Sequence, residues 1–310
     1  MLICFDIGGS RIKAGLSHRA GAVEPLGEAA TPLDDFEAFV AVLAEMVAPY
    51  RGEVLGVSIA TAGCVDPDTG VLVAANIASA HGHAIGPEIA AALGLPVWVA
   101  NDADCFALAE AGSGAGIGHR NVFGVILGSG VGGGLIIDGR IITGAGGYAG
   151  EWGHGPVLNT RLEALGLEIP HFACGCGQSG CVDTVGGARG LERLYLHMFG
   201  TQLTSTGIIG DWLADDPAAR LVLEAWLELV SGPLAMVLNV TGSSVVPVGG
   251  GLASVPGLIG MLDAAVRARI LRKTAGPLLV PAQHRIEPGL IGASLAGFQG
   301  LAERGGRADG

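Results

Sequence analysis

Three of the six cysteines in this 310-residue chain lie within eight residues, in the segment "CGCGQSGC" from Cys174 to Cys181. Their spacing, C-x-C-x4-C, supplies three soft thiolate ligands, and a structural Zn²⁺ site takes four ligands. Two histidines are candidates for the fourth position: His171, three residues before Cys174, and His154, twenty residues before it. The local spacing by itself favours His171.

Glycine-rich turns follow apolar runs at three places, in "DIGGS", "LGSGVGGG" and "VGGG". Consecutive glycine N–H groups can bind phosphate oxygens, because no β-carbon blocks the approach. One such turn alone is more often a tight hairpin. Three of them favour a nucleoside triphosphate, with Asp6 orienting a hydrated Mg²⁺. The predicted nucleotide-binding residues are Asp6, Gly8, Gly9, Ser10, Lys13, Gly128, Ser129, Gly130, Gly132, Gly133, Gly249, Gly250 and Gly251.

Two polar residues, Asn101 and Asp102, end the apolar run "VWVAND". Phosphoryl transfer to a hydroxyl needs positioning, charge neutralisation and a carboxylate that accepts the hydroxyl proton. Asp102 is the candidate for that base. It is equally suited to be the N-cap of the helix that follows, and the residues alone leave both roles open.

The elements that must position these groups alternate between strands and helices, which indicates an α/β fold. The chain twice begins with strand, glycine turn and strand, and we interpret this as a weak internal duplication. A domain boundary is therefore predicted near residues 114–118. The first domain is residues 1–117, joined by the C-terminal helix of about 289–310, and the larger second domain is residues 118–288 with the thiol-rich loop.

Three helices are predicted from apolar periodicity, over residues 35–50, 183–199 and 217–239. Asp34 and Glu37 resemble a capping box at the start of the first. Residues 229–262 carry no charge, but polar residues and glycines interrupt the run, so a buried helix, strand and helix fit better than a membrane span.

The composition is half apolar with a net charge of −12 and no basic run, which argues against a nucleic-acid surface. No signal peptide is visible, and a cytoplasmic location without membrane attachment is expected. Thiols stay reduced there, so the cysteine cluster indicates metal binding before disulfides.

Six segments together resemble the ROK family of sugar kinases and repressors: "FDIGGSRIKAG", "ANDADCFALAEA", "GVILGSGVGGGLIIDG", "GEWGH", "CGCGQSGC" and "IEPGLIGAS". The resemblance spans nearly the whole chain. It implies an actin/hexokinase-like, ribonuclease H-like α/β fold of two lobes with a cleft between them. It also implies ATP with Mg²⁺, and transfer of the γ-phosphoryl group to a sugar hydroxyl.

The resemblance also assigns roles to individual residues. Asp102 becomes the catalytic base, and His154 rather than His171 binds zinc with Cys174, Cys176 and Cys181, its other ring nitrogen facing the sugar. Asp183 stands where relatives usually have a Glu that contacts the sugar, and Asp104 where many have Asn. The implied sugar-binding residues are Gly63, Asn76, Asn101, Asp102, Glu151, His154 and Asp183.

The segment "AANIASAHGHAI" resembles the corresponding segment of the N-acetylglucosamine kinases of the family, which also has small residues after its asparagine. Small side chains after Asn76 would leave room for a 2-acetamido group. We therefore predict phosphorylation of N-acetyl-D-glucosamine to its 6-phosphate. Fructokinase, which the segment "AGEWGH" resembles, and glucokinase are the alternatives. A non-catalytic sugar-binding regulator is disfavoured, because a DNA-binding domain does not fit before Asp6. The expected partners are the sugar and ATP; the oligomeric state is open, with a homodimer as one candidate.

Overall fold

The strand that precedes the first glycine turn, β1 (Leu2–Ile7), is the central strand of a five-stranded sheet with the order β3-β2-β1-β4-β7. It pairs antiparallel with β2 and parallel with β4. The other strands are β2 (Arg11–Arg19), β3 (Ala22–Ala30), β4 (Val57–Thr61) and β7 (Val97–Asn101). The carboxyl ends of β1, β4 and β7 therefore lie at one edge of the sheet.

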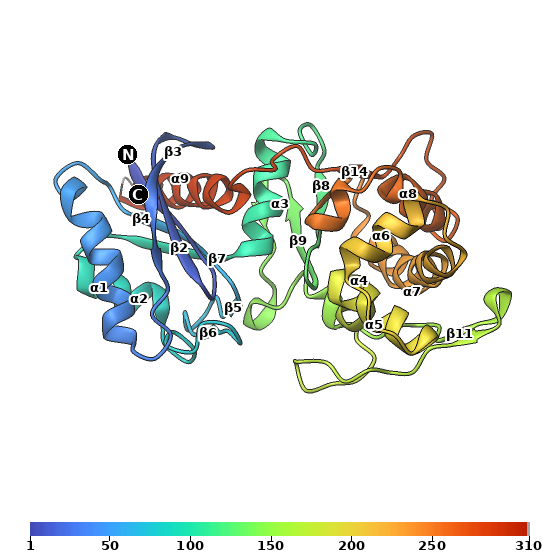
Figure 1. Cartoon of the computed structure of the whole chain (residues 1–310). Coiled ribbons are helices and arrows are strands. Elements are labelled where there is room, and N and C mark those ends of the chain that lie inside the picture. The colour runs from blue at the N-terminus through green and yellow to red at the C-terminus, as the bar shows by residue number, and fades with distance from the viewer. Residues whose placement is uncertain (309–310) are drawn as a thin grey trace. The chain divides into compact units, whose positions relative to one another are not determined.

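Both faces of this sheet are covered by helices, in this computed structural model of residues 1–308 (Figure 1). Side chains alternate along β1: Ile3, Phe5 and Ile7 enter a core with α1 (Phe36–Val47) and α2 (Ile85–Leu93). Leu2 and Cys4 enter a second core with α3 (Asp102–Ser113) and α9 (Pro288–Ala308). The predicted first helix is confirmed, but its N-cap is Asp35, which accepts from the Glu37 N–H, and not Asp34.

A second five-stranded sheet has the order β10-β9-β8-β13-β14. Its strands are β8 (Asn121–Leu127), β9 (Val131–Ile137), β10 (Arg140–Ile141), β13 (Val246–Gly249) and β14 (Leu279–Pro281). In both sheets the first strand is central, with the next two strands on one side and the last two on the other. This shared order supports the predicted duplication. The turn at Asp138 and Gly139 joins β9 to β10, and both residues have positive φ, at 51° and 74°.

The remaining helices are α4 (Asp183–Gly186), α5 (Ala188–Phe199), α6 (Ser205–Leu213), α7 (Pro217–Thr241) and α8 (Leu258–Arg267). Residues 183–199 were predicted as one helix, and the structure has two, divided at an extended Gly187. A β-carbon at Gly187 would lie 2.7 Å from the carbonyl oxygens of Ser129 and Gly130. The break therefore lets the chain pass against the second glycine turn.

One helix among residues 1–308, α7, is long and apolar enough to cross a membrane, but 61% of its apolar window is buried in the protein. It is followed by β13 and α8, so the uncharged run forms the buried helix, strand and helix that the sequence predicts. Two short hairpins complete the fold, β5 (Cys64–Val65) with β6 (Leu72–Val73) and β11 (Arg161–Leu162) with β12 (Leu167–Glu168).

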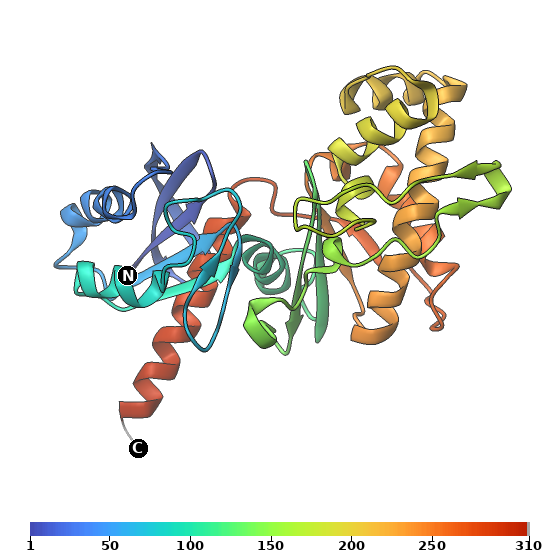
Figure 2. The ribbon, with the colours of Figure 1, turned by 90° about the horizontal axis from the view of Figure 1, so that it is seen from below.

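The chain divides into two compact units. The first holds residues 1–117, 134–149 and those from 284 onward, and the second holds 118–133 and 150–283. The segment 134–149 was predicted to belong to the second domain, and in the structure it groups with the first unit. Figure 2 shows α9 lying along the sheet of the first unit.

Candidate active site and metal centre

The first glycine turn lies against the segment that was predicted to bind the sugar. The Gly8 N–H donates to the Arg11 carbonyl oxygen at 3.0 Å, which closes the turn after β1. A β-carbon at Gly9 would lie 2.6 Å from the Asn76 carbonyl oxygen. Only glycine allows this approach, so the predicted phosphate loop and Asn76 are neighbours within the first unit.

Asn101, and not Asp102, is the N-cap of α3. Its Oδ1 accepts from the backbone N–H groups of Ala103 at 2.8 Å and Asp104 at 3.2 Å, and its Nδ2 donates to the Gly63 carbonyl oxygen at 2.9 Å. Asp102 is the first residue of the helix, and its Oδ1 also accepts from the Ala103 N–H at 2.8 Å. The helix therefore has its cap without Asp102, which leaves this carboxylate suited to a chemical role.

Gly63 is also required by its surroundings. Its φ is +103°, and a β-carbon there would lie 2.6 Å from the Val73 carbonyl oxygen. Together, Gly63, Asn76, Asn101 and Asp102 form one neighbourhood at the carboxyl ends of the parallel strands, where open α/β sheets bind ligands.

The carboxylates of Asp6 and Asp102 interact electrostatically. The pKa of Asp6 is raised from 3.8 to about 6: burial is the largest cause, the Asp102 and Glu287 carboxylates also raise the pKa, and the Lys13 ammonium lowers it. A β-carbon at Gly289 would lie 2.7 Å from the Asp6 carboxyl group, so the first turn of α9 packs against it. Carboxylates that repel one another suit a divalent cation with oxygen ligands, so Asp6 fits the predicted Mg²⁺ role.

Lys13 has a partner that sequence reasoning missed. Its Nζ lies 3.0 Å from Oε1 and 3.2 Å from Oε2 of Glu287, 274 positions along the chain. Glu287 has a φ of 49° and precedes Pro288, the first residue of α9. The segment "IEPG", a polar residue before a proline that begins a helix, is the signal that marks this position.

The second glycine turn is held by two other segments of the second unit. A β-carbon at Gly250 would lie 2.4 Å from the Leu127 carbonyl oxygen, so the third predicted loop touches the second. The Ala188 N–H, at the start of α5, donates to the Gly128 carbonyl oxygen at 2.8 Å. Two of the three predicted nucleotide segments are therefore in contact, beside a helix N-terminus, which favours anions.

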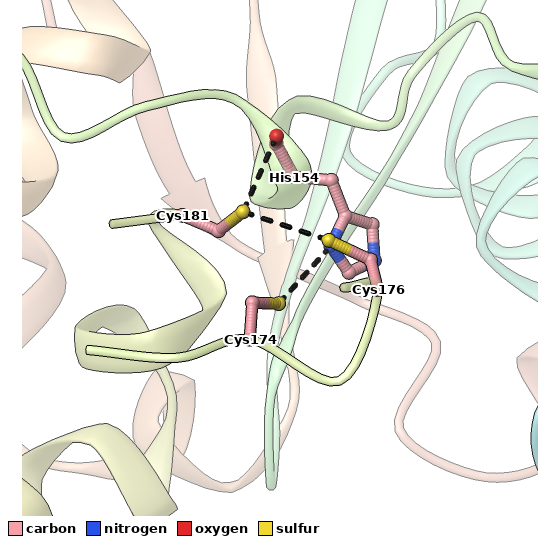
Figure 3. Close-up of side chains that lie close together, drawn as sticks. All are labelled: His154, Cys174, Cys176 and Cys181. Atoms are coloured by element: carbon pink, nitrogen blue, oxygen red, sulfur yellow. Dashed lines mark hydrogen bonds between the residues drawn. The ribbon is translucent and has the colours of Figure 1, made fainter. Parts of the chain in front are cut away.

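The thiol-rich loop and His154 form one compact cluster (Figure 3). The ligand atoms of His154, Cys174, Cys176 and Cys181 all lie within 4.8 Å of one another. Nδ1 of His154 lies 3.6 Å from Sγ of Cys174, and Sγ of Cys176 lies 3.7 Å from Sγ of Cys181. Tetrahedral zinc bond lengths imply separations of about 3.6 Å for nitrogen to sulfur and about 3.8 Å for sulfur to sulfur. The residues present therefore fit a four-coordinate zinc ion.

The structure brings His154 into this ligand group, and His171 lies beside it in the loop. A β-carbon at Gly180 would be 2.8 Å from the His171 ring, so that ring packs on the loop backbone. Backbone hydrogen bonds close the gap of twenty residues: the Val157 N–H donates to the Gly180 carbonyl oxygen at 2.7 Å, and the Val182 N–H to that of Gly155 at 2.9 Å. Local spacing favoured His171, whereas this pairing of distant segments places the His154 ring among the three thiols.

The second ring nitrogen of His154 faces a carboxylate. Nε2 lies 3.7 Å from Oε2 of Glu151, and both side chains are partly exposed. A ring whose Nδ1 is held in the thiol cluster keeps a fixed orientation, so Nε2 and Glu151 form a polar pair suited to hydroxyl groups.

The ROK family model matches residues 2–297. The chain belongs to the ROK family. The N-acetyl-D-glucosamine kinases of Shigella boydii serotype 4 and of Escherichia coli O127:H6 are each 34% identical to it, over 94% of this chain and 97% of theirs.

Solved structures of ROK proteins are similar over almost the whole chain. The ROK hexokinase of Thermus thermophilus is 29% identical, with a TM-score of 0.83, and covers 97% of this chain and 99% of its own. A ROK glucokinase of Streptomyces griseus, solved with glucose and AMPPNP, is 28% identical with a TM-score of 0.72, over 94% and 97% of the two chains. These likenesses confirm the predicted family and the two-lobed α/β fold class.

Asp183, the departure from the ROK pattern noted above, lies at the start of α4. Its Oδ1 accepts a hydrogen bond from the Val131 N–H at 2.7 Å, at the end of the second glycine turn. The residue that was predicted to contact the sugar thus touches the predicted nucleotide loop.

Proposed function

We propose that this ROK protein transfers the γ-phosphoryl group of ATP to N-acetyl-D-glucosamine, forming N-acetyl-D-glucosamine 6-phosphate. The observation that carries the chemistry is the placement of Asp102: Asn101 caps α3, and Asp102 follows it, where its charge raises the pKa of Asp6. The names of the 34%-identical relatives support the choice of sugar.

In this proposal Asp102 accepts the proton of the attacking sugar hydroxyl as the oxygen bonds to the γ-phosphorus and the bond to ADP breaks. Phosphoryl transfer asks little covalent chemistry of the protein, so a positioned base and charge neutralisation supply most of the rate. Asp6 would hold Mg²⁺ through its waters, and the ion would neutralise charge on the phosphates. The remaining predicted loop residues would hold the nucleotide through backbone N–H groups.

We propose that the sugar hydroxyls are bound by Asn76, Asn101, Glu151 and His154, with Gly63 keeping the approach open. The Asn101 side chain already makes three hydrogen bonds within the protein, so one N–H remains for a ligand. Glu151 accepts and His154 Nε2 donates or accepts, which suits a hydroxyl that does both.

We also propose that His154, Cys174, Cys176 and Cys181 bind one Zn²⁺. Four protein ligands leave no position for a reactive water, so the ion would be structural and would fix the orientation of His154. Reduced thiols are needed for this, which supports a cytoplasmic location. A homodimer stays a prediction, and light scattering on the purified protein tests it.

A coupled ATPase assay over a panel of hexoses tests the function. We expect the highest kcat/KM with N-acetyl-D-glucosamine, and none without Mg²⁺. A higher kcat/KM with fructose or glucose would overturn the proposal that N-acetyl-D-glucosamine is the substrate. Absence of turnover with every hexose, together with sugar binding by calorimetry, would favour a non-catalytic sugar-binding regulator instead.

A further inference from the structure

The carboxylate of Asp183 holds the point where the second glycine turn becomes strand β9. Its Oδ1 accepts from the Val131 N–H at 2.7 Å, and a β-carbon at Gly130 would lie only 2.3 Å from the same oxygen. Glycine at position 130 is therefore what allows the carboxylate to reach the backbone. The other end of the turn is also closed, because the Gly128 N–H donates to the Gly130 carbonyl oxygen at 3.0 Å.

The turn that ends at His154 holds the same strand start from a second direction. Trp152 Nε1 donates to the Gly132 carbonyl oxygen at 2.9 Å. A β-carbon at Gly153 would lie 2.5 Å from the Val131 carbonyl oxygen, so the two backbones are in close contact. Asp183 itself stands two residues after Cys181. The turn that ends at His154 and the segment that follows Cys181 therefore both contact the backbone where the glycine turn passes into β9.

We propose that Asp183 is a positioning residue for the nucleotide: it anchors the loop 128–133 in the conformation that binds phosphate. This inference rests on the proposed nucleotide role of that loop. A run of glycines has many backbone conformations, and ordering it costs free energy when a ligand binds. A carboxylate that accepts from a backbone N–H makes a strong, charge-assisted bond, which orders the loop before the ligand arrives.

This role separates Asp183 from a residue that only contacts the sugar. If Asp183 only contacted the sugar, its loss would lower the affinity for the sugar and leave the affinity for the nucleotide unchanged. If Asp183 anchors the loop, its loss lowers the affinity for the nucleotide even when no sugar is present. An asparagine at this position keeps an oxygen that accepts from the Val131 N–H, whereas an alanine leaves that N–H without its partner.

The test measures ADP binding by calorimetry, without sugar, on zinc-loaded wild-type protein and on the variants Asp183→Ala and Asp183→Asn. We expect Asp183→Ala to bind ADP roughly 10- to 100-fold more weakly, the loss typical of a hydrogen bond to a charged group. Asp183→Asn should stay within about 3-fold of wild type, because the acceptor is kept.

The matched control is Asp216→Ala. Asp216 is in the same unit, and its Oδ1 accepts from a backbone N–H, that of Ala219 at 2.9 Å, at the start of α7. This variant should lower stability and leave ADP affinity unchanged. ADP affinity of Asp183→Ala within twofold of wild type, with zinc content unchanged, would overturn the anchor. Equal weakening by Asp183→Asn and Asp183→Ala would overturn it as well, because charge alone would then be responsible.

A separate measurement distinguishes failure of the anchor from failure of the proposed function. Amide hydrogen exchange of wild-type protein without ligand should show a protected N–H at Val131, and rapid exchange there overturns the anchor even if no variant folds. If the wild type binds no ADP while Val131 is protected, the nucleotide role of the loop is wrong. The hydrogen bond would then be purely structural, and the positioning role would be overturned too.

Discussion

His154 and Cys174 are twenty positions apart, yet Nδ1 of the histidine lies 3.6 Å from Sγ of the cysteine. The same imidazole turns Nε2 toward Oε2 of Glu151, at 3.7 Å. One ring thus connects the thiol cluster to a polar pair that we propose binds the sugar. A metal at the cluster would fix the ring, and the ring would carry that order to the substrate.

His154→Ala should therefore lose zinc and sugar affinity together, because one ring serves both. His171→Ala should leave zinc content and sugar affinity nearly unchanged, because that ring packs on the loop at Gly180. Metal analysis of both variants, with sugar binding by calorimetry, checks the expectation. Zinc kept in His154→Ala and lost in His171→Ala would show that the local spacing identified the ligand after all.

Asp102→Asn should lower kcat by about 10²–10⁴-fold, the usual contribution of a positioned general base. The sugar KM should change much less, because the amide still forms hydrogen bonds. Asp104→Asn is the control on the same helix: it is an acidic residue of the first turn to which we assign no role, and kcat should stay within a few-fold. Near wild-type kcat in Asp102→Asn would mean that the base lies elsewhere.

Asp6→Asn should abolish Mg²⁺-dependent turnover and stabilise the unliganded fold at neutral pH. The pKa of Asp6 is about 6 in the folded protein against 3.8 ordinarily, chiefly because of burial. Because the folded state holds this proton more tightly than the unfolded chain, its stability falls as pH rises through the window from about 4 to about 6. A neutral amide escapes this loss, so the advantage of the variant should grow by ~1–3 kcal/mol between about pH 4 and pH 7.

Urea unfolding without magnesium or nucleotide measures this advantage at both pH values. Asp66→Asn provides a control with the opposite sign. Backbone hydrogen bonds from Thr69 and Asp68 lower the pKa of Asp66, so its stabilising contribution is present at neutral pH and disappears as pH falls. An advantage of Asp6→Asn that does not depend on pH would contradict the assignment of the raised pKa.

Substitution of the buried Glu110 should lower the free energy of unfolding more than most other substitutions in the first unit. It is fully buried in α3, and its two oxygens accept from the backbone N–H groups of His284 at 2.7 Å and Ala115 at 2.8 Å. These two N–H donors lie where the chain re-enters the first unit, at His284, and just before it leaves it, at Ala115. In Glu110→Gln one N–H faces an amide donor, which should cost ~2–4 kcal/mol in the free energy of unfolding.

The control for Glu110 is Glu28→Gln, which breaks an exposed ion pair with Arg11. Exposed pairs contribute little, so its cost should stay below ~1 kcal/mol. Thermal and urea unfolding measure both variants. Equal losses in the free energy of unfolding would mean that the N–H groups of Ala115 and His284 find other partners in Glu110→Gln. The buried carboxylate would then not stabilise the two places where the chain enters and leaves the first unit.

The sequence by itself determined the elements and much of the chemistry. Apolar runs that end in glycine turns predict strands that carry phosphate loops, because a strand needs only a local alternation and a turn only its own glycines. The spacing C-x-C-x4-C likewise predicts three thiolates in one loop. The ROK resemblance added the fold class and proposed His154 and Asp102 for their roles.

Only the tertiary structure decided which distant residues meet. It gave the helix cap to Asn101 rather than Asp102, paired Lys13 with Glu287, and brought His154 into the thiol cluster in place of His171. It also placed Asp183 on the backbone of the second glycine turn. Each of these contacts joins segments that are set by sheet order, packing and backbone pairing of the whole unit, and short-range spacing carries no information about them.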